Sequence, residues 1–108
     1  YAGAFPLWLA PIQVKVATIS EKQDEGANAV DQKLRSAGIR SEADLRSEKI
    51  NYKVREAEVQ KIPYVAVVGA KELENNSVNV RARGGKDLGQ IGIDAFIKKL
   101  KAEIAEKI

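Results

Sequence analysis

The sequence predicts an α/β protein with helices on both faces of a mixed sheet, whose first three strands are parallel and whose last strands form a hairpin. Tyr64–Val68 is an unbroken apolar run, typical of a strand that is buried on both faces. Ile93, Ile97, Leu100 and Ile104 recur at helical spacing near the end of the chain. Strand-like and helix-like segments alternate before these, which favours parallel strands joined by crossover helices.

The first third of the chain predicts a strand, a helix and a second strand. Apolar and polar residues alternate over residues 12–16, as in a strand with one face more buried than the other. A helix is expected from Asp24, and Gly38 is placed to end it. Residues 39–45 predict a short, polar strand near an edge of the sheet. The stripe of the helix consists of Ala27, Val30, Leu34 and Ala37.

A second helix precedes the central strand, and a further strand follows it. The helix is expected over residues 50–60, because Pro63 prevents its continuation. Residues 77–83 predict a strand that Gly84-Gly85 ends, and residues 74–77 the turn before it. The predicted order is strand, helix, strand, helix, strand, strand, helix. In the fourth strand Val78 and Val80 are expected to point inward, and Asn79 and Arg81 outward.

Composition excludes much of enzyme chemistry. The 108 residues carry a net charge of +3 and include neither Cys nor His. Disulfides, thiolate zinc sites, cysteine nucleophiles and histidine-based triads are therefore absent. At 44% apolar and 31% charged residues, the chain is expected to fold as one domain. Residues 1–11 are apolar without a clear period, which predicts a segment left over from a preceding domain.

Two enzymatic interpretations fail on spacing and surroundings. Gly84-Gly85-Lys86 lacks the spacing of a phosphate-binding loop, and Asp87 follows it, where an acid repels phosphate. Asp44 could pair with Glu42 or Glu48 as acid and base, but acids on an edge strand usually face water. Magnesium binding by carboxylates alone stays open, with no residues specified.

Several blocks of the sequence resemble threonyl-tRNA synthetases, in family order and spacing. They are Phe-Pro-Leu-Trp-Leu-Ala-Pro (5–11), Ala-Asp-Leu-Arg-Ser-Glu-Lys-Ile (43–50), Tyr-Lys-Val-Arg-Glu-Ala (52–57), Gln-Lys-Ile-Pro-Tyr (60–64), Val-Val-Gly (67–69), Lys-Glu (71–72) and Val-Arg-Ala-Arg-Gly-Gly-Lys-Asp-Leu-Gly (80–89). The chain thus resembles the C-terminal anticodon-binding domain at residues 12–108, after the end of a catalytic domain at 1–11. The related prolyl, glycyl and histidyl enzymes are the alternative, and the Arg-x-Arg-Gly-Gly block favours the threonyl family.

The resemblance implies a three-layer α/β/α anticodon-binding fold, with a mixed five-stranded sheet and three helices. It also implies that the domain reads the second and third anticodon bases of threonine tRNA, G and U. Guanine is recognised by a carboxylate or an arginine fork, and uracil by an arginine or an amide. By similarity Glu72 and Arg81 are the expected base readers. Lys49 and Ser47 match positions that contact the anticodon loop, although many family members have Asn in place of Ser47.

Basic side chains near these readers are expected to contact phosphates, which adds affinity without reading sequence. These are Arg46, Arg83 and Lys86. Arg55 is expected to cap or bridge the second helix. Tyr52 and Tyr64 are expected in or beside the core, with base stacking as the alternative.

The parent enzyme implied by the resemblance joins threonine to tRNA with ATP, Mg and a zinc ion of its catalytic domain. No catalytic residue, metal or cofactor is expected in these 108 residues. Phe5 and Trp8 are expected to pack against that catalytic domain. The parent is expected to be a cytoplasmic homodimer with no membrane partner, and the fragment alone a possible monomer. The competing hypotheses are a protein-binding domain of the same fold and a small flavodoxin-like enzyme, which residues 18–24 disfavour for lack of glycine.

Overall fold

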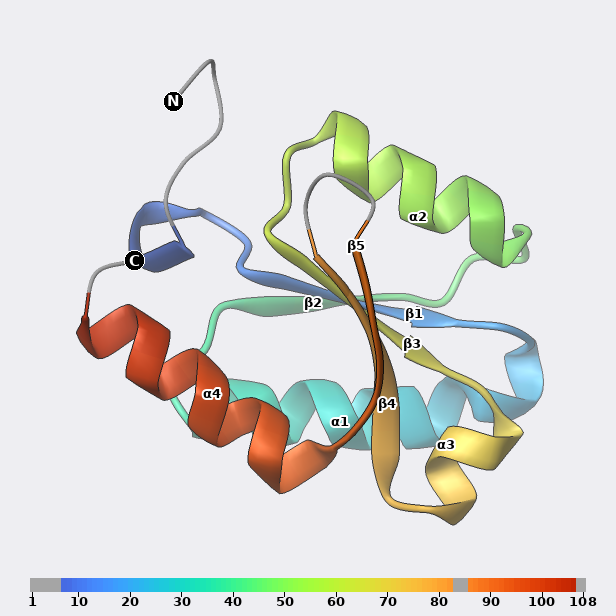
Figure 1. Cartoon of the computed structure of the whole chain (residues 1–108). Coiled ribbons are helices and arrows are strands. Elements are labelled where there is room, and N and C mark those ends of the chain that lie inside the picture. Colours follow the sequence, from blue (N-terminus) through green and yellow to red (C-terminus); the bar gives the residue numbers. More distant parts are fainter. Residues whose placement is uncertain (1–6, 83–85, 107–108) are drawn as a thin grey trace.

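The computed structural model describes residues 7–82 and 86–106, which form one five-stranded sheet with helices on both faces (Figure 1). The strand order is β2-β1-β3-β4-β5. The strands are β1 (Val14–Thr18), β2 (Ser41–Asp44), β3 (Tyr64–Val68), β4 (Ser77–Ala82) and β5 (Lys86–Gly92). The α-helices are α1 (Asp24–Ser36), α2 (Ile50–Val59), α3 (Ala70–Glu74) and α4 (Ile93–Ala105), and the 3-10 helices η1 (Leu7–Leu9) and η2 (Glu21–Gln23).

The three layers follow from the handedness of the crossovers. β1 pairs in parallel with both β2 and β3, as the sequence predicts, while β3–β4 and β4–β5 are antiparallel. The chain moves one way along the sheet from β1 to β2, and the opposite way from β2 to β3. Right-handed crossovers in opposite directions place their helices on opposite faces. Accordingly α2 covers one face, called here the α2 face, and α1 and α4 cover the other, the α1/α4 face (Figure 1).

The α1/α4 face holds the larger hydrophobic core. Even-numbered residues of β3 and the stripes of α1 and α4 meet there, including Val68, Leu34 and Phe96, each at most 1% exposed. Tyr64 packs edge-on against Phe96 with ring centroids 5.9 Å apart, which confirms its expected place at the core. On the α2 face, a smaller core gathers Ala17, Val54, Ala57, Ile62, Val65 and Val67.

Three details differ from the sequence expectations. β1 begins two residues later than predicted, although the Gln13 backbone amide donates to Arg40 O and Gln13 O accepts from the Tyr64 amide. The buried Gln13 side chain also bridges Leu7 O and the Arg40 amide. A fourth helix, α3, separates β3 from β4, so residues 74–77 lead from a helix into a strand. It has only five residues, too few to show a helical period. The residue pattern predicts no strand between Gly84-Gly85 and the last helix, yet β5 lies there. Gly84-Gly85, which is expected to end the preceding strand, lies outside the described residues.

The segment before β1 is fastened to the domain. Arg40 donates from Nε to Ala10 O and from Nη2 to Trp8 O, both at 2.9 Å. Leu7 is 2% exposed and belongs to the large core. The domain boundary expected at residue 11 stays a prediction. Within residues 7–82 and 86–106, none of the helices has the length and apolar character needed to cross a membrane.

Candidate nucleic-acid interface

The carboxyl ends of β1 and β3 lie side by side at one end of the sheet, at a place called here the crevice. The chain leaves these neighbouring strands in opposite directions, and open α/β sheets bind ligands at such points. Ile19 follows β1 and is 51% exposed. A Cβ added to Gly69 would lie 2.7 Å from the Ile19 side chain and 3.1 Å from Glu72 Oε1, so glycine permits this close approach. Glu72 Oε1 accepts a hydrogen bond from the Gly69 amide at 3.2 Å, which holds the half-buried carboxylate beside the crevice.

The loop after β2, residues 45–49, borders a hollow of about 470 Å³ that the segment after β1 closes on its other side. Ser47 and Lys49 line this hollow together with Ile19 and Ser20. Both Ser47 and Lys49 are exposed. The hollow is open, and both polar and apolar side chains line it.

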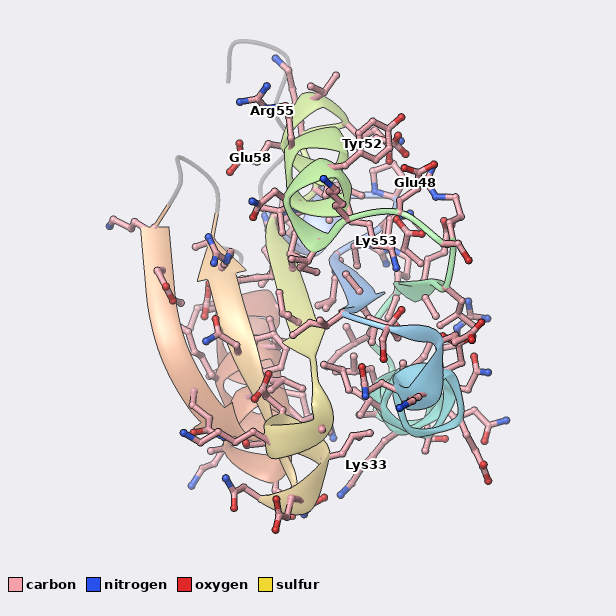
Figure 2. All side chains as sticks on the ribbon, turned by 90° about the vertical axis from the view of Figure 1, so that its right-hand side faces the viewer. Lys33, Glu48, Tyr52, Lys53, Arg55 and Glu58 are labelled. Carbon is pink, nitrogen blue, oxygen red and sulfur yellow. The ribbon has the colours of Figure 1, made fainter. Side chains whose placement is uncertain are left out.

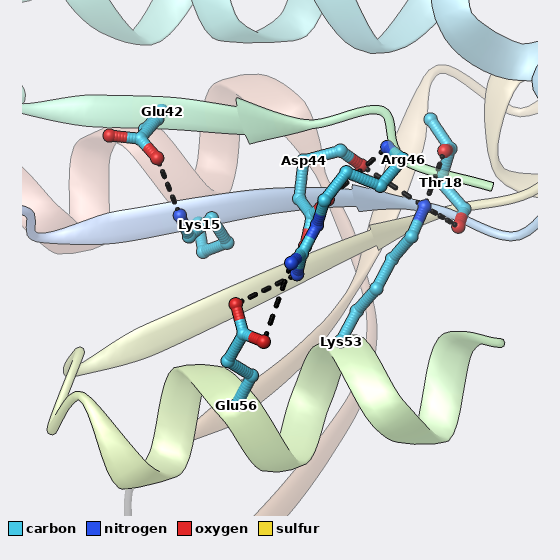
Figure 3. A network of polar contacts seen from close by, with 7 residues as sticks. All are labelled: Lys15, Thr18, Glu42, Asp44, Arg46, Lys53 and Glu56. Carbon is cyan, nitrogen blue, oxygen red and sulfur yellow. Dashed lines mark hydrogen bonds and ion pairs between the residues drawn. The ribbon is translucent and has the colours of Figure 1, made fainter. Parts of the chain in front are cut away.

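A network of ion pairs holds the base of this loop against α2 (Figure 3). Arg46 donates from Nε and Nη2 to the two oxygens of Asp44, at 2.9 and 2.8 Å. The same guanidinium donates from Nη2 and Nη1 to the two oxygens of Glu56, at 2.8 and 3.4 Å. These hydrogen bonds from Arg46 lower the pKa of Asp44 and of Glu56, and they raise the pKa of Arg46. Both carboxylates are therefore ionised at neutral pH.

Lys53 joins α2 to the ends of β1 and β2. It is 2% exposed, and its Nζ donates to Thr18 O, Thr18 Oγ1 and Asp44 O at 3.0, 3.0 and 3.1 Å. All three donors of the ammonium are thus used, which offsets part of the cost of burying its charge. Figure 3 shows Lys53 reaching from α2 towards these acceptors, beside the Asp44–Arg46–Glu56 network.

The β4–β5 half of the α2 face carries polar side chains. Asn79 and Arg81 pair with Val67 and Val65 of β3, whose side chains lie in the core under α2. The side chains of Asn79 and Arg81 therefore also point to the α2 face. Gln90 opposes Asn79 on β5. Asn79 Oδ1 is buried with no hydrogen-bond partner among the described residues, and Arg81 is exposed. Val78 and Val80 are buried as predicted and Arg81 is exposed as predicted, whereas Asn79 is half-buried rather than turned outward. These side chains leave a polar surface beside α2.

Glu72 and Arg81 lie towards opposite ends of the central strand. Arg81 pairs with Val65, the second residue of β3, whereas Glu72 follows the last residue of β3 by four positions. The backbone from Val65 to Val68 alone spans roughly 10 Å. The two expected base readers therefore lie at two separate places around the sheet.

The basic residues expected at phosphates differ in their availability. Arg46 makes four hydrogen bonds to Asp44 and Glu56, so its guanidinium is largely occupied. Lys86 is exposed, but it pairs with Ala82 and so lies on the sheet face opposite to Arg81. Arg83 lies outside the described residues. In the part of the chain that the structure describes, no hydrogen bond or ion pair is found for the side chains of Ser47, Lys49, Arg81 and Lys86.

Two residues of α2 lie elsewhere than expected. Tyr52 is 50% exposed rather than packed in the core, and the Arg46 guanidinium lies 5.7 Å from its ring centroid. Arg55 is exposed and, within residues 7–82 and 86–106, neither caps nor bridges the helix. Figure 2 shows Arg55 and Glu58 on the side of α2 nearer β4 and β5, with Tyr52 and Glu48 on the other side. Arg55 is thus an exposed cation beside the polar surface.

Sequence reasoning missed three residues of this region. Ile19 could have been noticed as an apolar residue between a strand and a polar loop. Lys53 reads as a surface lysine in an amphipathic helix, and nothing local signals its burial. Glu56 pairs with a residue ten positions earlier, which only the fold brings close. Among the described residues, no group of three or more His, Cys, Asp or Glu side chains is arranged to hold a metal ion.

Taken together, the open mixed sheet and the exposed cationic side chains beside it are typical of an α/β ligand-binding module. The chain belongs to the anticodon binding domain family, whose model matches residues 13–103. It is 52% identical over its full length to threonine–tRNA ligase of Clostridium acetobutylicum and 57% identical over 104 residues to that of Thiobacillus denitrificans. It spans only 17% and 16% of these relatives.

Solved structures agree with the sequence relatives. The RNA binding domain of threonyl-tRNA synthetase from Cryptosporidium parvum superposes with a TM-score of 0.88 at 32% identity, over 94% of this chain and 26% of that one. A prolyl-tRNA synthetase of the same organism superposes at 0.83 and 28% identity, over 96% of this chain and 23% of that one. The family and the α/β class predicted from the sequence are thereby confirmed.

Proposed function

We propose that this chain reads the second and third anticodon bases, G and U, of threonine tRNA. On this proposal it serves ATP-dependent threonylation by a catalytic domain elsewhere in a longer protein. The observation that carries the proposal is the placement of polar side chains at two separate places around the sheet. Arg81 is exposed on the α2 face, Glu72 is half-buried beside the crevice, and Ser47 and Lys49 line the hollow. Proteins read RNA mainly through unstacked loop bases, whose hydrogen-bonding edges are accessible.

The separation of the two expected base readers supports separate roles for them in anticodon recognition. Glu72 is held at the carboxyl end of β3 by the Gly69 amide, and Arg81 projects from the other end. On this proposal each binds a different anticodon base. Ser47 and Lys49 flank the first of these places, and the exposed side chain of Ile19 offers an apolar surface against which a base can pack.

Phosphate contacts are proposed for cations around this surface. Lys86 and Arg83 are the expected contacts, and Arg55 joins them because it is exposed on the side of α2 that borders β4 and β5. Such contacts raise affinity for any RNA and make binding fall with salt. Arg46 was expected to act in the same way. Its four hydrogen bonds to carboxylates favour a different role, argued below.

The parent protein is proposed to be a threonine–tRNA ligase, as its relatives are named. Its ATP, Mg and zinc would bind in the catalytic domain, and Phe5 and Trp8 would pack against that domain. A cytoplasmic homodimer is the proposed state of the parent. The segment at residues 7–10 fits a linker that is held in a fixed direction, since Arg40 binds two of its carbonyl groups.

The proposal is tested by titrating the 108-residue chain at low salt with three anticodon stem-loops. One carries GGU, one has its second anticodon base changed, and one has its third base changed from U to G, as in a proline tRNA. Tighter binding of GGU than of both others supports the proposal. Equal binding of all three stem-loops would mean that the chain contacts only their phosphates. If none of them binds, a protein-binding domain of the same fold is favoured.

Two variants locate the readers. Arg81→Ala is expected to weaken GGU binding by about 1–3 kcal/mol and to relax the preference at one anticodon position. Glu72→Gln is expected to relax the preference at the other position. If either variant keeps both preferences, that residue is not a reader. The exposed Lys98→Ala on α4 is the matched control and should change neither preference.

A further inference from the structure

Two carboxylates lie next to a surface that is proposed to bind a polyanion. Asp44 ends β2 directly before the loop of residues 45–49, and Glu56 lies on the second turn of α2. Both contact Arg46, the second residue of that loop, through paired hydrogen bonds. An unpaired acid at this position would repel phosphates, so the arrangement needs a physical reason.

The network fixes the loop at its start while leaving its tip free. Arg46 O accepts a hydrogen bond from the Glu48 amide at 2.8 Å, and the Arg46 amide donates to Asp44 Oδ1 at 3.3 Å. The Arg46 backbone and side chain are thus tied to β2, to α2 and to the next turn of the loop. Ser47 and Lys49 project from this turn, and no hydrogen bond or ion pair of their side chains is found within the described residues.

We infer that Glu56, acting through Arg46, is a positioning residue that holds the loop of residues 45–49 in the conformation that reads the anticodon. This inference rests on the proposed function. Its consequence is unusual for an RNA-binding surface: an acidic side chain increases discrimination between RNAs. A phosphate-binding Arg46 has the opposite consequence, because removing Glu56 would then free a cation and strengthen binding to every RNA.

Glu56→Gln separates these two roles by the sign of the effect. The amide keeps the size of the side chain and removes the charge that holds Arg46. The matched control is Glu42→Gln, which removes one negative charge from the same polar groove. Glu42 pairs with Lys15 at 2.6 Å, and within residues 7–82 and 86–106 no hydrogen bond or ion pair joins its side chain to the loop. Each variant is titrated with the GGU stem-loop and with the loop changed at one anticodon base, and each titration is repeated at several salt concentrations.

The positioning role predicts that Glu56→Gln lowers the ratio of the two affinities by about threefold or more, without changing the salt slope. Glu42→Gln should leave the ratio unchanged. The double variant Arg46→Gln with Glu56→Gln should lose no more discrimination than Arg46→Gln alone, because both act through one contact. Unchanged or tighter binding of Glu56→Gln to both RNAs overturns the inference, as does an equal loss for both.

Hydrogen exchange of the free protein keeps this test independent of RNA. Loosening of the loop should speed exchange of the Glu48 amide at least severalfold in Glu56→Gln, and leave it unchanged in Glu42→Gln. If wild type fails to discriminate between the RNAs while the Glu48 amide still responds to Glu56→Gln, the proposed function fails and the positioning of the loop stands. If wild type discriminates and the amide does not respond, the positioning role is overturned alone.

Discussion

The two faces of the sheet differ in the proportion of apolar and charged groups that they bury. On the α1/α4 face, fifteen buried residues form one apolar cluster that reaches from Leu7 to Leu100. On the α2 face, six buried apolar residues share the interface with a buried lysine and two ion-paired carboxylates. Apolar burial is non-directional, whereas hydrogen-bonded charges fix positions closely. The first face therefore mainly stabilises the fold, and the second mainly fixes the geometry of the candidate interface.

The largest expected effect is on the α1/α4 face. Phe96→Ala should reduce the free energy of unfolding by about 3–5 kcal/mol, because it leaves a cavity at a side chain that is 1% exposed. Val59→Ala, an apolar truncation at a 73% exposed residue of α2, should change it by less than about 0.5 kcal/mol. Urea denaturation measures both. Equal effects of the two variants would contradict the assignment of stability to the large core.

A smaller loss of stability is expected from the charged side of α2. Lys53→Met keeps the length of the side chain but leaves Thr18 O, Thr18 Oγ1 and Asp44 O without their donor. The expected loss is about 1–3 kcal/mol in the same measurement. The exposed Lys49→Met serves as the control and should be nearly neutral. A Lys53→Met protein as stable as wild type would mean that burying the ammonium costs as much as its three hydrogen bonds return.

Acid should weaken the α2 face selectively. Hydrogen bonds from Arg46 hold the pKa of Asp44 below its ordinary value of 3.8 and that of Glu56 below 4.5. A lowered folded-state pKa stabilises the protein above the unfolded value, and this contribution disappears as pH falls through the folded value. The stability difference between wild type and Glu56→Gln should be constant above about pH 5 and shrink below about pH 4. Urea denaturation across this range tests it. A difference that persists undiminished to about pH 2 would show that Arg46 does not act through the charge of Glu56.

The elements of the α1/α4 face were predictable because local patterns encode them. Local sequence alone predicts a buried strand from the apolar run of β3 and an amphipathic helix from the apolar stripe of α4. It also predicts a helix end from the glycine after α1, and Gly38 has a φ of 86°. Gln13 and α3 were not predictable in this way. The burial of Gln13 depends on partners at Leu7 and Arg40, and α3 is too short to carry a pattern.

The sequence predicts which residues belong to the candidate site, but not how they are arranged in space. The family blocks point to Ser47, Lys49, Glu72 and Arg81, yet only the register shows how they are grouped. An irregularity between Val80 and Arg81 pairs Arg81 with Asp87 and leaves Leu88 without a partner on β4. A shift of one residue moves a side chain to the other face of a sheet, so this bulge decides which cations share a face. The Arg46–Glu56 pair and the burial of Lys53 likewise depend on how α2 crosses the sheet.

The smallest expected effect tests how cleanly the two faces are separated. Lys86 begins β5 on the face opposite to Arg81, but it stands at the free edge of the sheet, where a long side chain can reach a phosphate beside the hairpin. Lys86→Ala should weaken all stem-loops about equally and lower the slope of log affinity against log salt by about 1. Lys98→Ala removes the same charge from α4, far from the α2 face, and should leave the slope unchanged. If Lys86→Ala also leaves it unchanged, RNA binding is confined to the α2 face, and the expected phosphate contact at Lys86 is wrong.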